Sequence, residues 1–117
     1  MRPGAHTPEQ LESLLEDAFL MRDVEALCAM FAAGAVLLAD AGRREARGSA
    51  EIGRFARTLW NVDRTYVAEP CRVIQARGTA LVVGRGGISV VRRRPDGEWR
   101  YAIALLASTH HPTEEQR

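Results

Sequence analysis

Two carboxylates and a histidine have the chemistry of an acid/base site. Asp40 follows a short apolar run, Glu69 precedes Pro70 within a long apolar segment, and His110 follows the last apolar segment. An apolar enclosure raises a carboxylate pKa toward values useful for a general base, and histidine titrates near neutral pH. We therefore predict Asp40, Glu69 and His110 as candidate catalytic residues. The alternatives are a solvated turn aspartate, an exposed strand glutamate and a frayed tail.

Metal and covalent chemistry are not indicated. Cys28 and Cys71 show no Cys-x-x-Cys or Cys/His ligand spacing, and both are interpreted as structural thiols in a reducing setting. All sixteen basic residues are arginine, so no lysine is present to form a Schiff base. We predict no metal and no cofactor.

The charges are nearly balanced, with sixteen basic against fifteen acidic side chains. Such a balance creates no general field that would recruit nucleic acid or an anionic membrane. The run 92–94, with Arg85 and Arg100 nearby, could hold a carboxylate or phosphate, although a solvated edge that discourages strand pairing is the other interpretation. Residues 1–6 lack the charged start and apolar core that are typical of a signal peptide, and no apolar run approaches the roughly 20 residues of a membrane helix. We therefore expect a cytoplasmic protein with no nucleic-acid and no membrane partner.

The first half of the chain predicts three amphipathic helices. One begins at Thr7-Pro8, where a capping residue precedes a proline, and carries an apolar stripe at three- and four-residue steps. A second is capped by Asp23 and is expected to end at Gly34. A third is expected to be capped by Ser49 and to end near Trp60. A hairpin of residues 35–40 and 43–47 separates the last two helices.

The second half predicts strands over 65–76, 79–85, 88–94 and 99–107, joined by short glycine-containing turns. This order predicts an α+β fold, with three N-terminal helices on one face of a curved antiparallel sheet. The 117 residues suit a single domain, with a core over 8–108 and flexible tails at 1–6 and 109–117. The last strand is apolar on both faces, so its outer face is expected to meet a second subunit.

Several strings in this order resemble the nuclear-transport-factor-two-like superfamily, in particular its SnoaL-like and ketosteroid-isomerase-like branches. They are residues 22–27 (RDVEAL), 30–32 (MFA), 47–52 (RGSAEI) and 93–100 (RRPDGEWR). The resemblance implies a cystatin-like α+β barrel, in which a cone-shaped sheet admits a ligand between itself and the helices. It also implies a homodimer formed through the outer sheet face. It implies no single activity, because the fold hosts isomerases, cyclases, hydratases and binding subunits.

Ketosteroid isomerase uses an aspartate base, a tyrosine and a protonated aspartate. Matching by resemblance places its base at Ala39, its tyrosine at Leu15 and its protonated aspartate at or near Ser89. The usual isomerase mechanism is therefore not predicted. A bulge or register slip would be needed to turn the Asp40 carboxylate into the cone.

The remaining side chains of interest are aromatic or apolar. Trp60 and Tyr66 are expected near the mouth of the cone, where aromatic walls hold apolar ligands, with simple core packing as the alternative. The predicted ligand-binding residues are Trp60, Tyr66, Leu15, Phe19, Phe55 and Ser89. We predict a SnoaL-like protein that binds a small apolar or polyketide-like molecule, with cofactor-free isomerisation, cyclisation or hydration as its chemistry if it is an enzyme. The alternative is a non-catalytic ligand carrier or a dimeric accessory subunit.

Overall fold

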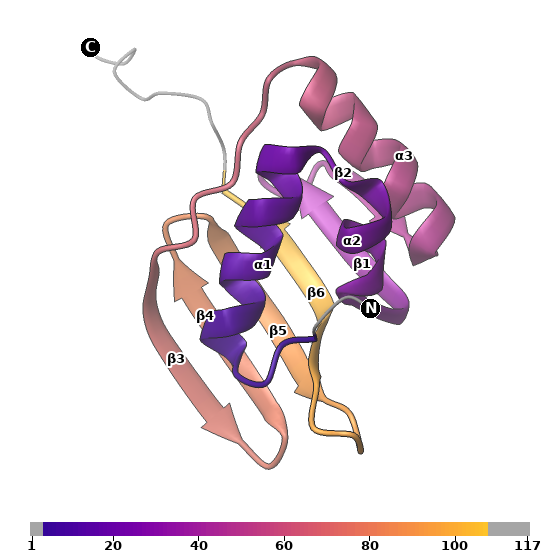
Figure 1. Ribbon diagram of the computed structural model, residues 1–117. Helices are drawn as coiled ribbons and strands as arrows, with labels where there is room; N and C mark the ends of the chain where they lie inside the picture. The colour runs from indigo at the N-terminus through magenta and orange to yellow at the C-terminus, as the bar shows by residue number, and fades with distance from the viewer. Residues whose placement is uncertain (1–3, 108–117) are drawn as a thin grey trace, which may run out of the picture.

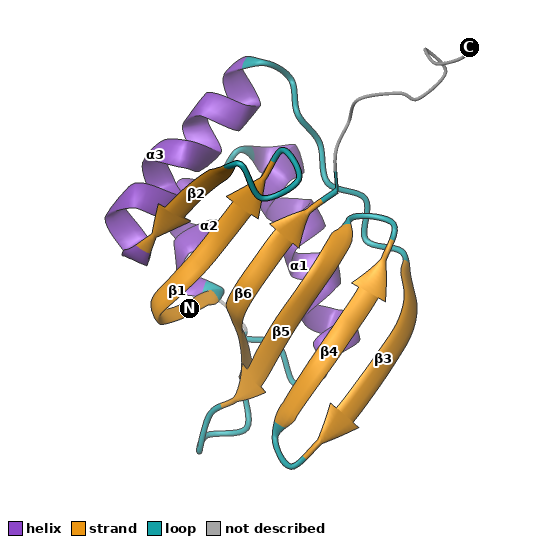
Figure 2. Cartoon of the chain, turned by 180° about the vertical axis from the view of Figure 1, so that it is seen from behind, coloured by secondary structure: helices purple, strands orange, loops and turns teal. Residues whose placement is uncertain are grey.

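The computed structural model describes residues 4–107 as two layers, with three helices on one face of a six-stranded sheet (Figures 1 and 2). The elements are α1 (Pro8–Met21), α2 (Val24–Ala29), β1 (Phe31–Ala39), β2 (Arg44–Arg47), α3 (Gly48–Asn61), β3 (Pro70–Ala76), β4 (Thr79–Gly84), β5 (Gly87–Arg93) and β6 (Trp99–Leu106). The predicted α+β class is confirmed.

The strand order is β2-β1-β6-β5-β4-β3, and the sheet stays open rather than closing into a barrel. Four pairings are antiparallel, but β1 and β6 run parallel, with Leu37 opposite Ala104. The predicted antiparallel meander of the later strands is confirmed, and the pairing of β1 with β6 adds one parallel pair that the sequence did not indicate. The two strands are far apart in sequence, and no local turn signal specifies how they pair.

The start of α1 follows the predicted capping pattern. Thr7 Oγ1 accepts a hydrogen bond from the Gln10 amide at 3.0 Å, while the Gln10 side chain accepts one from the His6 amide at 2.7 Å. Pro8 occupies the first turn, where its missing N–H leaves no intrahelical bond unmade. The helix ends at Met21, and its C-cap residue Arg22 takes the left-handed conformation with φ 51°.

Three predicted boundaries are wrong. The second helix ends at Ala29 rather than Gly34, because Phe31 already pairs with Tyr101 of β6, and Gly34 lies in a β1 irregularity at φ 74°. The third helix has Arg47 rather than Ser49 at its N-cap. The Glu51 side chain accepts a hydrogen bond from the Arg47 amide at 2.9 Å. The predicted strand over 65–76 begins only at Pro70, where proline needs no amide partner.

The predicted N-terminal tail is partly folded. Ala5 is buried and bridges to Trp99, whose amide donates to the Ala5 carbonyl at 2.8 Å. Residues 109–117, including His110, lie outside the described residues. Within residues 4–107, no helix has the length and apolar character needed to cross a membrane.

Candidate functional site

A buried glutamate, Glu12, lies on the inward face of α1. The Glu12 side chain is only 2% exposed, and both of its oxygens accept hydrogen bonds from phenols. Tyr66 Oη donates to Glu12 Oε1 at 2.5 Å, and Tyr101 Oη donates to Glu12 Oε2 at 2.5 Å. We call Glu12, Tyr66 and Tyr101 the Glu12 triad. Its members come from three separate elements: α1, the loop between α3 and β3, and β6.

Glu12 is buried because it lies on the inward face of α1. Its neighbours on that face are Pro8, Leu15 and Phe19, at spacings of four, three and four residues. Glu12 is not among the site residues predicted from the sequence. The available signal was a glutamate on an otherwise apolar stripe, three positions before Leu15 and seven before Phe19.

Burial, reinforced by the charge of Glu12, raises the pKa of both the Tyr66 and Tyr101 phenols well above the ordinary value of 10.0. Both phenols therefore remain protonated donors at neutral pH. Each carboxylate oxygen has a second lone-pair site after accepting one phenol. The two phenols therefore hold the Glu12 side chain in one orientation, and each of its oxygens retains one lone-pair site that no phenol uses.

An aromatic wall adjoins the Glu12 triad. The Phe19 ring contacts Trp60 edge-on and Tyr66 at a tilt, with ring centroids 5.8 Å apart in both pairs. The predicted ligand-binding residues Leu15, Phe19, Phe55, Trp60 and Tyr66 all belong to one buried cluster, and Ser89 on β5 is also buried. The structure thus brings these residues into the interior, and their role toward a ligand stays a prediction.

The predicted catalytic carboxylates lie elsewhere. Asp40 occupies the turn after β1 at φ 55°, and its half-exposed side chain faces Arg44 at 3.7 Å and Arg64 at 3.8 Å. The side chain of Glu69, just before β3, is 57% exposed and pairs with Arg85 at 3.3 Å. The structure does not bring these two carboxylates to the Glu12 triad. Their catalytic role, like that of His110, stays a prediction.

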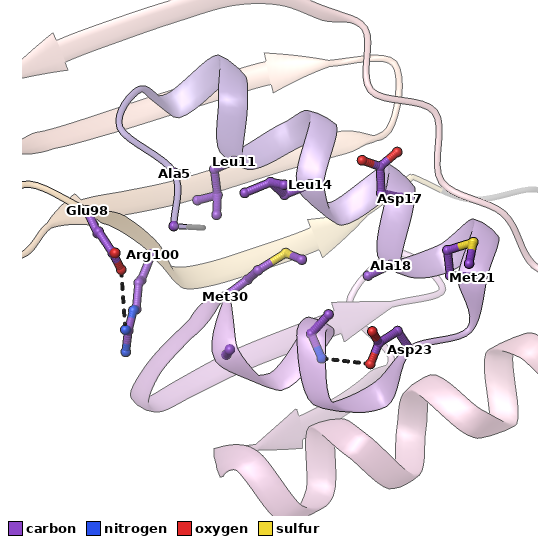
Figure 3. A pocket seen from close by; sticks show the side chains of 13 residues that line it. Ala5, Leu11, Leu14, Asp17, Ala18, Met21, Asp23, Met30, Glu98 and Arg100 are labelled. Atoms are coloured by element: carbon purple, nitrogen blue, oxygen red, sulfur yellow. Dashed lines mark hydrogen bonds and ion pairs between the residues drawn. The ribbon is translucent and has the colours of Figure 1, made fainter. Parts of the chain in front are cut away.

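A separate cavity of about 270 Å³ lies between α1, α2 and the start of β6 (Figure 3). Leu11, Leu14 and Met30 make its wall apolar, and Asp17, Glu98 and Arg100 are at its rim. Glu98 and Arg100 pair with each other at 3.6 Å. Because Glu12 projects from another side of α1, this cavity does not include the triad.

Residues 4–107 contain no group of three or more His, Cys, Asp or Glu side chains placed to hold a metal ion. Cys28 and Cys71 are both free thiols.

No protein-family model matches the chain, and no curated protein sequence matches it. Three solved structures illustrate its structural similarity. A ketosteroid isomerase-like protein from Erwinia carotovora atroseptica has a TM-score of 0.74 at 20% identity, over 89% of this chain and 94% of the other. A protein of unknown function with a cystatin-like fold from Nostoc punctiforme has a TM-score of 0.70 at 18% identity, over 83% and 84%.

The third, a SnoaL-like protein of unknown function from Burkholderia thailandensis, has a TM-score of 0.56 at 19% identity, over 85% of this chain and 92% of the other. Identities this low establish the fold and leave the activity open. The fold expected from the sequence resemblance is confirmed. This chain has the cystatin-like α+β fold that nuclear-transport-factor-two-like, ketosteroid-isomerase-like and SnoaL-like proteins share.

Proposed function

We propose that this protein binds a small, largely apolar molecule between the sheet and the helices and performs cofactor-free acid/base chemistry on it, with Glu12 transferring the proton. The observation that carries the proposal is the Glu12 carboxylate, buried among apolar groups with a phenol on each oxygen. Burying a carboxylate costs several kcal/mol, and well-packed apolar residues commonly replace such groups without loss of stability. Buried ionisable clusters are accordingly concentrated at functional sites.

The chemistry that suits this arrangement is isomerisation through an enolate. Glu12 takes a proton from the carbon beside a carbonyl, the C–H electron pair moves into the enolate, and the proton returns at another carbon. Tyr66 and Tyr101 orient the carboxylate while its remaining lone pairs face the substrate. Substrate enters by displacing the segment 62–69, which carries Tyr66 and forms neither helix nor strand. Such loops open at lower free energy than packed helices or strands.

A non-catalytic ligand carrier or accessory subunit is the second candidate. It is favoured by the surface positions of Asp40 and Glu69, whose carboxylates are paired with arginines rather than held in the interior. In this case the Glu12 triad serves only to orient α1 against the loop and β6. The two candidates differ in whether Glu12 exchanges protons with a bound molecule.

We also propose that the protein is a homodimer formed through its outer sheet face. No helix covers this face in Figure 2, and Ile74, Leu81, Ile88 and Ile103 are 37–47% exposed. Strand pairing aligns Ile74 with Leu81, Leu81 with Val90, and Val90 with Ile103. The result is a continuous apolar band across four strands, the kind of surface that a second copy covers in a symmetric dimer.

The acid/base proposal is tested with β-tetralone, an apolar bicyclic ketone with acidic C–H bonds beside its carbonyl. Exchange of these protons in deuterium oxide is followed by NMR, with the protein-free rate subtracted. We expect the wild-type protein to accelerate exchange and Glu12→Gln to lose about 100-fold or more of that acceleration, the scale of a lost general base. Glu25→Gln, which changes an exposed carboxylate on α2, is the matched control and should exchange like the wild type. Binding of β-tetralone without accelerated exchange would favour the carrier instead.

A further inference from the structure

The cavity between α1, α2 and the start of β6 plays no part in the proposed acid/base chemistry, because none of the Glu12 triad lines it. Its volume of about 270 Å³ is just below the range of about 300–1,000 Å³ that holds drug-sized ligands. Leu11, Ala18 and Met30 are buried residues in its lining. A hollow of this size in the helical layer suits a small molecule rather than a peptide.

One side of α1 supplies most of the apolar wall. Leu11, Leu14, Ala18 and Met21 recur at three- and four-residue steps, which places them along the same side of the helix. Met30, just after α2, points toward Leu14 (Figure 3). Met21 is 77% exposed although it lines the cavity. Because thioether side chains adapt to irregular apolar shapes, this wall can close around the hydrocarbon part of a ligand.

The charge at the rim of the cavity is mainly negative. Glu98 and Arg100 pair at 3.6 Å, so their charges largely offset each other. Asp17 is different, because no ion pair among residues 4–107 includes its carboxylate. Asp23, also in the lining, is held at the start of α2, where its carboxylate accepts a hydrogen bond from the Ala26 amide at 3.0 Å.

Two helix ends add to this negative potential. Met21 and Ala29, the last residues of α1 and α2, both line the cavity. The carbonyl end of a helix carries partial negative charge and favours a nearby cation, yet neither helix has a basic residue in its last turn. Arg22, which follows α1, pairs with Asp63 at 3.0 Å. The cavity therefore combines an apolar wall with surroundings that favour positive charge.

We propose that this cavity is a second ligand site, which binds a small apolar amine in its cationic form. The hydrocarbon part lies against Leu14, Met21 and Met30, and the ammonium group pairs with Asp17. A ligand carboxylate would be repelled by Asp17 and would find Arg100 already paired with Glu98. A neutral ligand would gain only the apolar contact. The amine class also differs from the neutral molecule proposed for the Glu12 triad.

Three probes with the same ring system test the charge preference: 2-naphthylmethylamine, 2-naphthalenemethanol and 2-naphthoate, which are cationic, neutral and anionic at neutral pH. We expect calorimetry to show that the amine binds about tenfold more tightly than the alcohol, with naphthoate the weakest. Added salt should reduce this preference, because Asp17 is exposed to solvent.

A charge variant assigns the preference to the rim. Asp17→Asn should weaken amine binding about two- to fivefold, the scale of an exposed ion pair, and leave the affinity for the alcohol unchanged. Glu25→Gln is the matched control, because it removes an exposed carboxylate from α2 outside the cavity. It should leave the ratio of the two affinities unaltered.

Methionine methyl signals locate the bound probe. The chain contains three methionines, of which Met21 and Met30 line the cavity. In protein labelled with carbon-13 at the methionine methyl groups, the amine should move both signals, which Met21→Leu and Met30→Leu assign. Ala29→Phe fills the cavity from an exposed position in its lining and should abolish the binding of both amine and alcohol.

Several results would overturn the proposal. They are an alcohol or naphthoate affinity equal to that of the amine, equal effects of Asp17→Asn and Glu25→Gln, amine binding that leaves the Met21 and Met30 signals in place, or no amine binding at the solubility limit. A failure of proton exchange with β-tetralone would refute only the proposed acid/base function, because Glu12 does not line this cavity.

Discussion

Replacing the whole Glu12 triad by apolar residues should separate a functional role from a structural one. Tyr101→Phe removes one hydrogen bond to a charged acceptor and should lower the free energy of unfolding by about 1.5–3 kcal/mol. Glu12→Leu removes the acceptor of two buried phenols, each costing about 1–3 kcal/mol when unpaired, so its cost should be about 2–6 kcal/mol.

The triple variant Glu12→Leu, Tyr66→Phe, Tyr101→Phe leaves none of these polar groups unpaired. It also avoids the desolvation cost of the carboxylate, which amounts to several kcal/mol. We therefore expect the triple variant to be at least as stable as the wild type, despite the losses in the single variants.

Urea unfolding curves with unchanged slopes would measure these differences. Losses that simply add, making the triple variant the least stable, would show that the triad stabilises the fold and would refute the reasoning that it is retained for function.

Three further outcomes are expected. Because both tyrosines have pKa values raised above 10.0 in the folded state, neither should ionise near pH 10 while folded; stability should fall above that pH by about 1.4 kcal/mol per pH unit for each phenol, and the tyrosinate absorbance should appear only as the protein unfolds. Gly86→Ala would place a Cβ 2.5 Å from the Tyr66 ring and should cost about 1–3 kcal/mol in a thermal melt, whereas Gly53→Ala, whose nearest contacts are at 3.4 Å, should not; equal melting temperatures would contradict the packing of Tyr66. Ile103→Asp should convert the proposed dimer to a monomer in sedimentation experiments, whereas Leu20→Asp, on the helical layer, should not; a wild-type monomer would refute the interface.

Most elements could be predicted because their signals are local. The cap at Thr7-Pro8, the stripe along α1 and the turns between the later strands each involve residues within a few positions of one another. A predicted boundary was wrong where pairing with a distant strand outweighed the local helix preference. The sequence pattern predicts Phe31 at the end of an apolar helix face, yet in the structure Phe31 pairs with Tyr101 and belongs to β1.

The candidate site could be predicted only in part. The aromatic and apolar lining was identified from amphipathic patterns, because a pattern shows which side chains face inward. Carboxylates that adjoin apolar runs predict the acid/base group at Asp40 and Glu69. In the structure Asp40 lies in a turn, and both carboxylates pair with arginines at the surface. Glu12 is not predicted from the sequence because charged residues on helices are usually solvated.

By itself, the sequence determined the order of the elements, the inward faces of the helices and the α+β class, because these follow from periodicity and capping between near neighbours. Tertiary structure alone decided the parallel pairing of β1 with β6 and the meeting of Glu12 with two phenols that lie 54 and 89 residues away. Such contacts depend on how the sheet and helices pack in three dimensions. The spacing of residues along the chain does not predict that packing.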